Sequence, residues 1–247
     1  MLKLERTQIC GLEPAMRGAR NPMNSWAKSD SVYCTDRESC EDCPCRDVVC
    51  DGGCSRHELE PFVIGPNDHD LAMRLRNAGT DHRKYMRMIV VYVDVTAPLY
   101  FWKEADQYKV GTTTNSCSTM HKIHAKEFVL DDFSHEHLSP RALDRLMDTI
   151  KELNYWRDIF INGGTDDSTG VMRIYEPKDK DAWWQMIQLL PSSYNQMRTW
   201  MLNYEVLADI YNARKNHKLD CWREVAKWIE NLPYSEFITG HVEENAR

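Results

Sequence analysis

The pattern of apolar and polar residues predicts a chain with more helix than strand. Apolar residues at helical spacing between Asn67 or Asp68 and Gly79 predict a helix, because Asn or Asp begins helices well and Gly ends them. The run MRMIVVYVDV, residues 86–95, is short, apolar and β-branched, so it predicts a strand. Pro98 directly after it favours the first turn of a second helix.

The remainder of the chain continues this pattern. The first 33 residues predict an irregular or strand-like start, and residues 162–170, NGGTDDSTG, predict a turn-rich loop. We see no internal repeat. Helical spacing predicts four further helices, over residues 140–153, 183–190, 193–211 and 222–229.

Composition and charge narrow the possible classes of protein. The 247 residues are 42% hydrophobic, which is enough for one domain over residues 1–247 with a cysteine-rich insert at 34–54. The net charge of −7 argues against binding to nucleic acid through overall charge. No apolar run is long enough to span a membrane, and the N-terminal stretch lacks the apolar segment of a signal peptide. We therefore expect a soluble, cytoplasmic protein.

The insert concentrates six cysteines within about twenty residues. The Cys40-x-x-Cys43 spacing is common in zinc and iron–sulfur sites, and His57 is a possible further ligand. A cytosolic location favours metal over disulfides. Free thiols on an acidic surface insert remain the alternative. The proposed metal ligands are Cys34, Cys40, Cys43, Cys45, Cys50 and Cys54.

Two other stretches carry candidate chemistry. In TTTNSCSTMH, residues 112–121, Cys117 with His121 or His124 would form a thiol–imidazole pair, although a lone cysteine is more often a small buried residue. The run TDHRKYMR supplies a local basic patch from three residues. Such a patch is either a solvated surface or a place to hold a phosphate. Its members are Arg83, Lys84 and Arg87.

Residues 97–121 read APLYFWKEADQYKVGTTTNSCSTMH: Ala-Pro after a strand, then a helix, a polar triplet and an Asn/Ser loop. The segment resembles the signature region of the flavin-dependent thymidylate synthases. In that family an Arg-Gln pair, an Arg-His-Arg triplet and an Asn-Glu-x-Ser-x-Arg loop follow Ala-Pro. The corresponding residues here are Lys103-Glu104 for the pair, Gln107-Tyr108-Lys109 for the triplet, and Asn115, Ser116 and Ser118 in the loop.

A second segment resembles the same family near the C-terminus. Residues 190–214 read LPSSYNQMRTWMLNYEVLADIYNAR, where the family has Leu-Pro followed by a helix carrying Trp, Asn, Leu and Arg. The two motifs occur in the family's order and cover roughly residues 67–125 and 180–230. The matching residues are Leu190, Pro191, Trp200, Asn203, Leu207 and Arg214.

The resemblance implies an α+β, helix-rich fold with a small antiparallel sheet, assembled as a homotetramer. It implies FAD as cofactor, a pyrimidine nucleotide as substrate, and folate and NADPH as co-substrates. Substrate contacts are implied for Lys103, Glu104, Ser116, Ser118 and Arg214. Cofactor contacts are implied for His82, Gln107, Tyr108, Lys109, Asn115, Asn203 and Asp209. His82 as an ordinary helix-end residue and Arg214 in a salt bridge are the structural alternatives.

The chain departs from the family where positive charge matters. Three family arginines hold the nucleotide; here two of these positions are Met120 and Ile187, and the third is Arg214. The family's arginine on the Asn-x-Arg helix is Glu205 here. Losing charge-assisted contacts of roughly 1.5–3 kcal/mol each would change the ligand unless other cations substitute. The candidate substitutes are Lys103, Lys109, Lys122, Lys126, His121 and His124.

Three functions therefore compete. The first is an FAD-dependent enzyme that transfers a one-carbon unit to a pyrimidine nucleotide, a methyltransferase of nucleotide biosynthesis with an altered substrate site. The second is a catalytically inactive homo-oligomeric protein that binds a nucleotide or flavin. The third is a metal-binding protein centred on the cysteine cluster.

Overall fold

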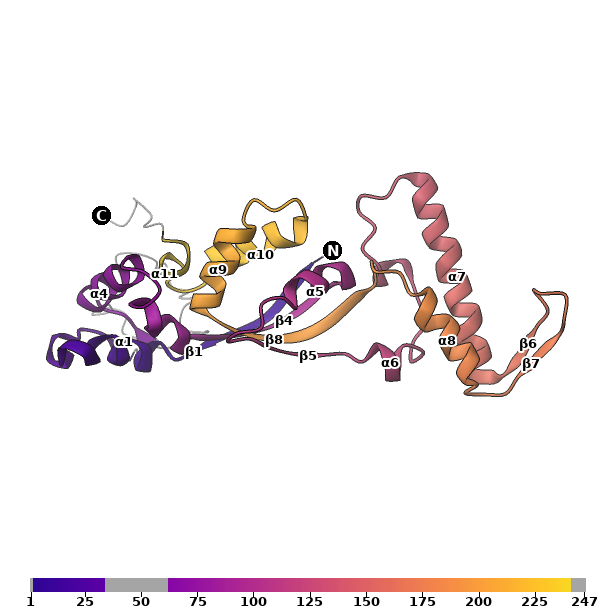
Figure 1. Cartoon of the computed structure of the whole chain (residues 1–247), viewed down its shortest axis with the longest axis horizontal. Coiled ribbons are helices and arrows are strands. Elements are labelled where there is room, and N and C mark those ends of the chain that lie inside the picture. The colour runs from indigo at the N-terminus through magenta and orange to yellow at the C-terminus, as the bar shows by residue number, and fades with distance from the viewer. Residues whose placement is uncertain (1, 34–61, 241–247) are drawn as a thin grey trace, which may run out of the picture. The chain divides into compact units, whose positions relative to one another are not determined.

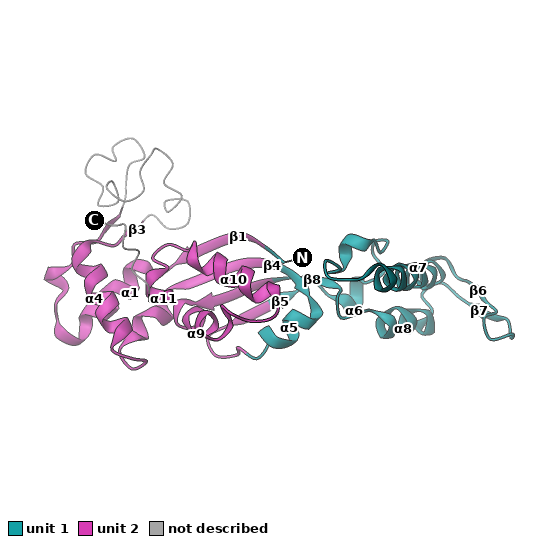
Figure 2. Ribbon diagram, turned by 90° about the horizontal axis from the view of Figure 1, so that it is seen from above, with its two compact units in different colours: residues 1–3, 95–107, 115–198 teal, residues 4–94, 108–114, 199–247 magenta. Residues whose placement is uncertain are grey.

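The computed structural model describes residues 2–33 and 62–240 (Figure 1). The chain divides into two compact units, which Figure 2 shows in different colours. Unit 1 comprises residues 1–3, 95–107 and 115–198. Unit 2 comprises residues 4–94, 108–114 and 199–247. The six cysteines proposed as metal ligands, and His57, lie outside the described residues.

The principal sheet has four strands in the order β1-β4-β8-β5, and the boundary between the units falls within these strands. The β-branched run predicted as a strand is β4, in which Val91 and Val93 are buried while Tyr92 between them is 40% exposed. This alternation is the period of two expected for a strand. The bounds are β1 Lys3–Cys10, β4 Val90–Pro98, β5 Thr113–Ser116 and β8 Asn195–Asn203.

Two smaller sheets are antiparallel pairs, β2 Val32–Tyr33 with β3 Phe62–Val63, and β6 Gly164–Asp166 with β7 Arg173–Tyr175. The predicted α+β class, rich in helix with small antiparallel sheets, is confirmed.

Unit 2 packs its helices through buried apolar faces and through buried ion pairs such as the one between α1 and α4. Helix α9 packs against α10, α11 and the 3-10 helix η4, and α1 packs against α4 and η4. Arg20 on α1 donates to Asp68 on α4, and both side chains are almost fully buried. The bounds are α1 Leu12–Arg20, η1 Asn21–Met23, η2 Trp26–Lys28, α4 Pro66–Asn77, η4 Arg83–Met88, α9 Tyr204–Arg214, α10 Asp220–Glu230 and α11 Glu236–Thr239.

Unit 1 contains the longest helix, α7, which packs against α8 and carries the β6–β7 hairpin beyond its C-terminus (Figure 1). Ser139 caps α7 as the sequence predicts, since its Oγ accepts a hydrogen bond from the Ala142 amide at 3.4 Å. Buried aromatic and aliphatic residues such as Trp156 and Leu153 form the core. The bounds are α5 Leu99–Ala105, α6 Thr119–Lys122, η5 Leu130–Asp132, α7 Pro140–Asn162 and α8 Lys180–Leu189.

The loop predicted over residues 162–170 contains strand β6, which pairs with β7. Three further sequence predictions of secondary structure are wrong. Residues 195–203 form strand β8 rather than the first half of a long helix, and the helix begins at Tyr204. Part of the polar run predicted as a loop is strand β5. The start of the chain also holds helix α1, which the pattern did not predict. In each case pairing or packing between distant segments decides the structure, which local spacing does not report.

Candidate functional site

The junction between β8 and α9 brings the two motif regions into contact within unit 2. Asn203 is the N-cap of α9, because its Oδ1 accepts a hydrogen bond from the Val206 amide at 3.0 Å. Its Nδ2 donates to the carbonyl oxygen of Gly111 at 3.4 Å. Gly111 has φ 72°, and a Cβ there would lie 2.5 Å from Asn203 Nδ2. A glycine is therefore required for this close approach.

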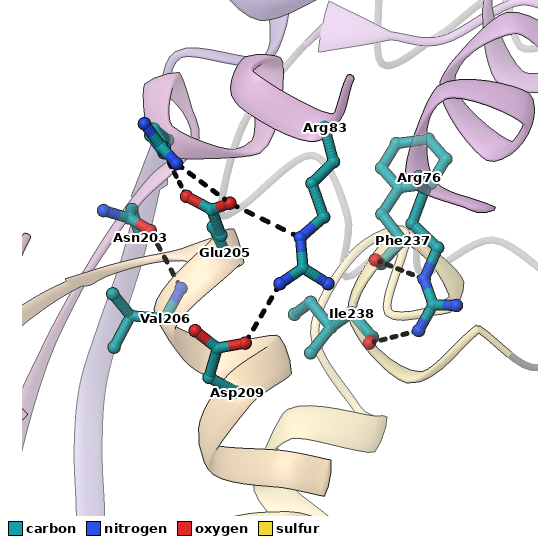
Figure 3. Close-up of polar contacts among 9 residues, drawn as sticks. Arg76, Arg83, Asn203, Glu205, Val206, Asp209, Phe237 and Ile238 are labelled. Carbon is teal, nitrogen blue, oxygen red and sulfur yellow. Dashed lines mark hydrogen bonds and ion pairs between the residues drawn. The ribbon is translucent and has the colours of Figure 1, made fainter. Parts of the chain in front are cut away.

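Glu205, in the first turn of α9, is a buried carboxylate held by two arginines (Figure 3). Arg83 Nε donates to Glu205 Oε1 at 3.4 Å, and Arg87 Nε donates to Oε2. Burial alone would raise the pKa of Glu205, but the hydrogen bonds and charges of Arg87 and Arg83 lower that pKa below its ordinary value. Glu205 is therefore ionised at neutral pH.

Asp209, one turn further along α9, completes this cluster. Its Oδ1 accepts a hydrogen bond from Arg83 at 3.0 Å (Figure 3). Nearby, Arg76 donates to the carbonyl oxygens of Phe237 at 3.3 Å and Ile238 at 3.1 Å. Burial and the charge of Arg83 lower the pKa of Arg76. This part of unit 2 thus concentrates cationic side chains around the N-terminal half of α9.

Arg214 ends α9 and lies against aromatic residues. Its Nε donates to the Tyr108 hydroxyl at 3.1 Å, and its guanidinium lies 5.1 Å from the ring centroid of Trp222. Arg214 is also 3.0 Å from Nε2 of His217. The structure therefore brings together two residues predicted from separate motifs, Tyr108 and Arg214. His217 and Trp222 are neighbours that the sequence did not assign to the site.

Two other predicted cofactor residues lie on the surface of unit 2. His82 precedes η4 and its amide donates to the Gly79 carbonyl at 3.1 Å. The side chains of His82 and Lys109 are exposed. Both remain predictions as ligand contacts.

Unit 1 carries the other predicted site residues on α5 and on the β5–α6 segment. Lys103 and Gln107 are exposed, and Glu104 between them is half-buried on α5. Exposed residues continue along β5, and Ser118 caps α6 by accepting a hydrogen bond from the His121 amide at 3.1 Å. Asn115 and Ser116 lie on β5 with exposed side chains.

Cys117 is fixed through its backbone rather than its thiol. Its amide donates to the Met197 carbonyl at 2.9 Å, and its carbonyl accepts from Gln196 Nε2 at 2.8 Å. Within the described part of the chain, no hydrogen bond joins the thiol to His121 or His124. The geometry therefore gives no support to the thiol–imidazole pair.

Arg198 on β8 holds Gln196, the residue that bonds the Cys117 carbonyl. Its Nε donates to Gln196 Oε1 at 3.1 Å, and it pairs with Asp106 at 2.7 Å. Its guanidinium lies 4.3 Å from the ring centroid of Trp102, an arrangement typical of a cation–π contact.

Neither a metal-binding cluster nor a membrane-spanning helix occurs in the described residues. Among residues 2–33 and 62–240, no cluster of three or more His, Cys, Asp or Glu side chains is arranged to hold a metal ion. No helix in those ranges combines the length and apolarity that crossing a bilayer requires.

Comparison with known proteins identifies the fold. No protein-family model matches the sequence, and the comparison with curated proteins gives no match either. A structure of thymidylate synthase X from Helicobacter pylori with FAD and dUMP is similar, with a TM-score of 0.58 and 15% identity over 97% of this chain and 98% of that chain. A structure of flavin-dependent thymidylate synthase from the same organism, complexed with FAD and dUMP, gives 0.57 and 15% over 96% and 99%. The chain thus has a flavin-dependent thymidylate synthase-like fold.

Proposed function

We propose that this protein binds FAD and a pyrimidine nucleotide and modifies the nucleotide by one-carbon transfer, with a substrate site altered from that of the flavin-dependent thymidylate synthases. The observation that carries the proposal is the meeting of the two motif regions at the ends of α9. Tyr108 contacts Arg214 at one end, and Gly111 contacts Asn203 at the other. The members of these pairs are 106 and 92 residues apart in the sequence, so a chance local match does not account for them.

The residues present are suited to holding FAD. A dinucleotide needs cationic and N–H donors for its diphosphate, and unit 2 offers the arginines around Glu205 together with the Asn203 amide. The backbone at Gly111 has no side chain to obstruct a close approach. When bound, the flavin supplies the chemistry that carries a hydride or one-carbon unit, so the mechanism requires no protein nucleophile.

The chain's own residues would bind and orient the ligands. The proposed substrate contacts are Lys103, Glu104, Ser116, Ser118 and Arg214. The proposed cofactor contacts are His82, Gln107, Tyr108, Lys109, Asn115, Asn203 and Asp209. Folate and NADPH as co-substrates, a homotetrameric assembly and a cytoplasmic location belong to the same proposal.

The decisive experiment identifies what the purified protein carries and converts. Protein isolated without added cofactor is denatured, and the released small molecules are identified by mass spectrometry. The apoprotein is then incubated with FAD, NADPH, a methylene-carrying folate and dUMP, and the nucleotide products are separated. Flavin in the released fraction and a methylated nucleotide support the enzyme. Protein that neither contains flavin nor gains flavin absorbance with FAD contradicts the proposal.

A non-catalytic binding protein is the second candidate, and the substrate side favours it. Met120 is 47% exposed on α6, and Ile187 on α8 is likewise apolar, where the family resemblance leads us to expect arginines. Bound nucleotide or flavin without turnover would support this candidate. A metal found by elemental analysis, with neither ligand bound, would support a function centred on the cysteine cluster.

A further inference from the structure

Two arginines on η4 converge on a single buried carboxylate. Arg83 and Arg87 are four residues apart, and both donate to Glu205, whose side chain is 11% exposed. One guanidinium is sufficient to neutralise one carboxylate. The second arginine, Arg87, has a side chain that is 55% exposed, so a ligand in solvent can reach it while it stays bonded to Glu205.

The charges of the groups that act on this pair are balanced. Arg76, Arg83 and Arg87 carry three positive charges, and Glu205, Asp209 and Asp81, whose charge acts on Arg87, carry three negative charges. On a chain whose net charge is −7, such a balanced cluster repels an anionic ligand less than the surface as a whole does.

Both arginines also retain hydrogen-bonding capacity. A guanidinium has five N–H donors in a planar fork. Arg83 uses Nε and one terminal nitrogen on Glu205 and Asp209, and Arg87 uses Nε and one terminal nitrogen on Glu205. The remaining terminal nitrogen of each has no protein acceptor among the described residues. Two forks fixed by one carboxylate are well suited to the oxygens of a phosphate.

We propose that Arg83 and Arg87 form a phosphate-binding pair, that Glu205 is the positioning residue for it, and that Asp209 competes with the ligand for Arg83. The ligand class is a phosphate or diphosphate ester, and its assignment to FAD or to the nucleotide rests on the proposed function. Because Glu205 already holds both arginines in place, their side chains lose little conformational freedom when a ligand binds.

The competition with Asp209 makes the inference testable in two opposite directions. Arg87→Gln removes a donor and a charge, and we expect affinity for inorganic pyrophosphate, and for either FAD or dUMP, to fall about tenfold or more. Asp209→Asn removes the negative charge that competes for Arg83, and we expect affinity for inorganic pyrophosphate, which has no other part for Asp209 to contact, to rise severalfold. A purely structural ion-pair network would weaken folding in both variants and tighten binding in neither.

Arg74→Gln is the matched control. Arg74 lies on α4 of the same unit, pairs with Asp70 at 3.0 Å and is 68% exposed. The substitution Arg74→Gln therefore removes one positive charge from a surface ion pair. We expect the affinities of this variant for the ligands to stay within about twofold of wild type. Urea unfolding checks that each variant is folded. Arg87→Lys keeps the positive charge but removes the planar guanidinium, so it tests whether the charge alone is sufficient for binding.

Isothermal titration of the full chain uses four probes: inorganic pyrophosphate, FAD, dUMP and phosphate-free riboflavin. Selective loss of FAD or dUMP affinity in Arg87→Gln, with riboflavin unchanged, supports the pair and identifies the source of its phosphate. If Arg87→Gln loses no more affinity than Arg74→Gln, the inference is overturned even when FAD still binds. If wild type binds pyrophosphate through Arg87 but does not bind FAD, the phosphate pair stands and the proposed function fails.

Discussion

Asp68 carries a buried negative charge that stabilises unit 2. Its carboxylate accepts hydrogen bonds from Arg20 and from the Ser29 and Ser31 hydroxyls, and its side chain is fully buried. Removing one partner of a buried ion pair leaves the other uncompensated. Asp68→Asn should therefore lower the free energy of unfolding by about 3–5 kcal/mol, measured by urea denaturation. Asp70→Asn on the same helix, at an exposed ion pair, should change it by less than about 1 kcal/mol.

The same carboxylate predicts how stability depends on pH. Burial alone would raise the pKa of Asp68, but hydrogen bonds from Ser29, Ser31 and Arg20 bring that pKa below its ordinary value. A folded pKa below the unfolded value of about 3.9 means that the stabilisation is complete above that pH. It is then lost as the pH falls towards the folded pKa. Subtracting the Asp68→Asn curve from wild type should show this loss below about pH 4. A difference independent of pH would contradict it.

Met120 occupies a position of the proposed substrate site where the resemblance to flavin-dependent thymidylate synthases leads us to expect an arginine. It is exposed at the start of α6, so an arginine fits there without entering the core. If the altered charge explains a weakened nucleotide site, Met120→Arg should raise dUMP affinity about tenfold, measured by isothermal titration. Met172→Arg adds the same charge at another exposed methionine of unit 1 and serves as the control. Equal gains in dUMP affinity in both variants would show that the added positive charge acts wherever it is placed, and not through the proposed substrate site.

At the scale of elements, one residue at the start of α9, Asn203, both caps the helix and belongs to the candidate site. Asn203 caps the helix with its Oδ1 and reaches Gly111 with its Nδ2. Asn203→Ala should lose about 1 kcal/mol of stability together with FAD affinity. Asn203→Ser keeps a capping oxygen but loses the amide donor, so FAD affinity should fall while the urea midpoint stays near wild type. Unchanged FAD binding in both variants would limit Asn203 to its capping role.

Strand β8 shows how far local pattern could predict these elements. Met197, Trp200 and Tyr204 are spaced three and four apart, which imitates a helix, yet the first two belong to a strand. A central position in a four-stranded sheet decides the outcome, and pairing partners far away in sequence supply that information. Helices α7 and α10 were predicted correctly because their own apolar faces are sufficient to specify them.

Like the secondary structure, the candidate site is predictable from the sequence only in part. Tyr108 and Arg214 were accessible from motif resemblance, and the structure brings them into contact. The pairing of Glu205 with Arg83 and Arg87 was not, because it joins residues more than one hundred positions apart. From the sequence alone, Glu205 is interpreted as the loss of a positive charge, because the resembling family has an arginine at this position. In the fold, the same region retains cations on η4.

At the scale of the whole molecule, ligand-linked stability separates the competing functions. A ligand that binds the folded chain at one hundred times its dissociation constant adds about 2.7 kcal/mol of stability. For a chain of this length, that corresponds to a rise in the unfolding midpoint of roughly 5–10 °C. FAD should produce this shift under the proposed function, and dUMP should add to it. Riboflavin at the same concentration, which lacks the phosphates, is the control and should give a smaller shift.

The metal-centred alternative predicts the reverse result in the same scan. A structural metal stabilises the folded chain, so removing it with a chelator should lower the midpoint, whereas FAD should have no effect. Protein that is insensitive to chelator and stabilised by FAD excludes a metal-dependent fold as the basis of function. Protein that loses stability with chelator and recovers it with zinc, but does not respond to FAD, would move the functional centre to the cysteine cluster.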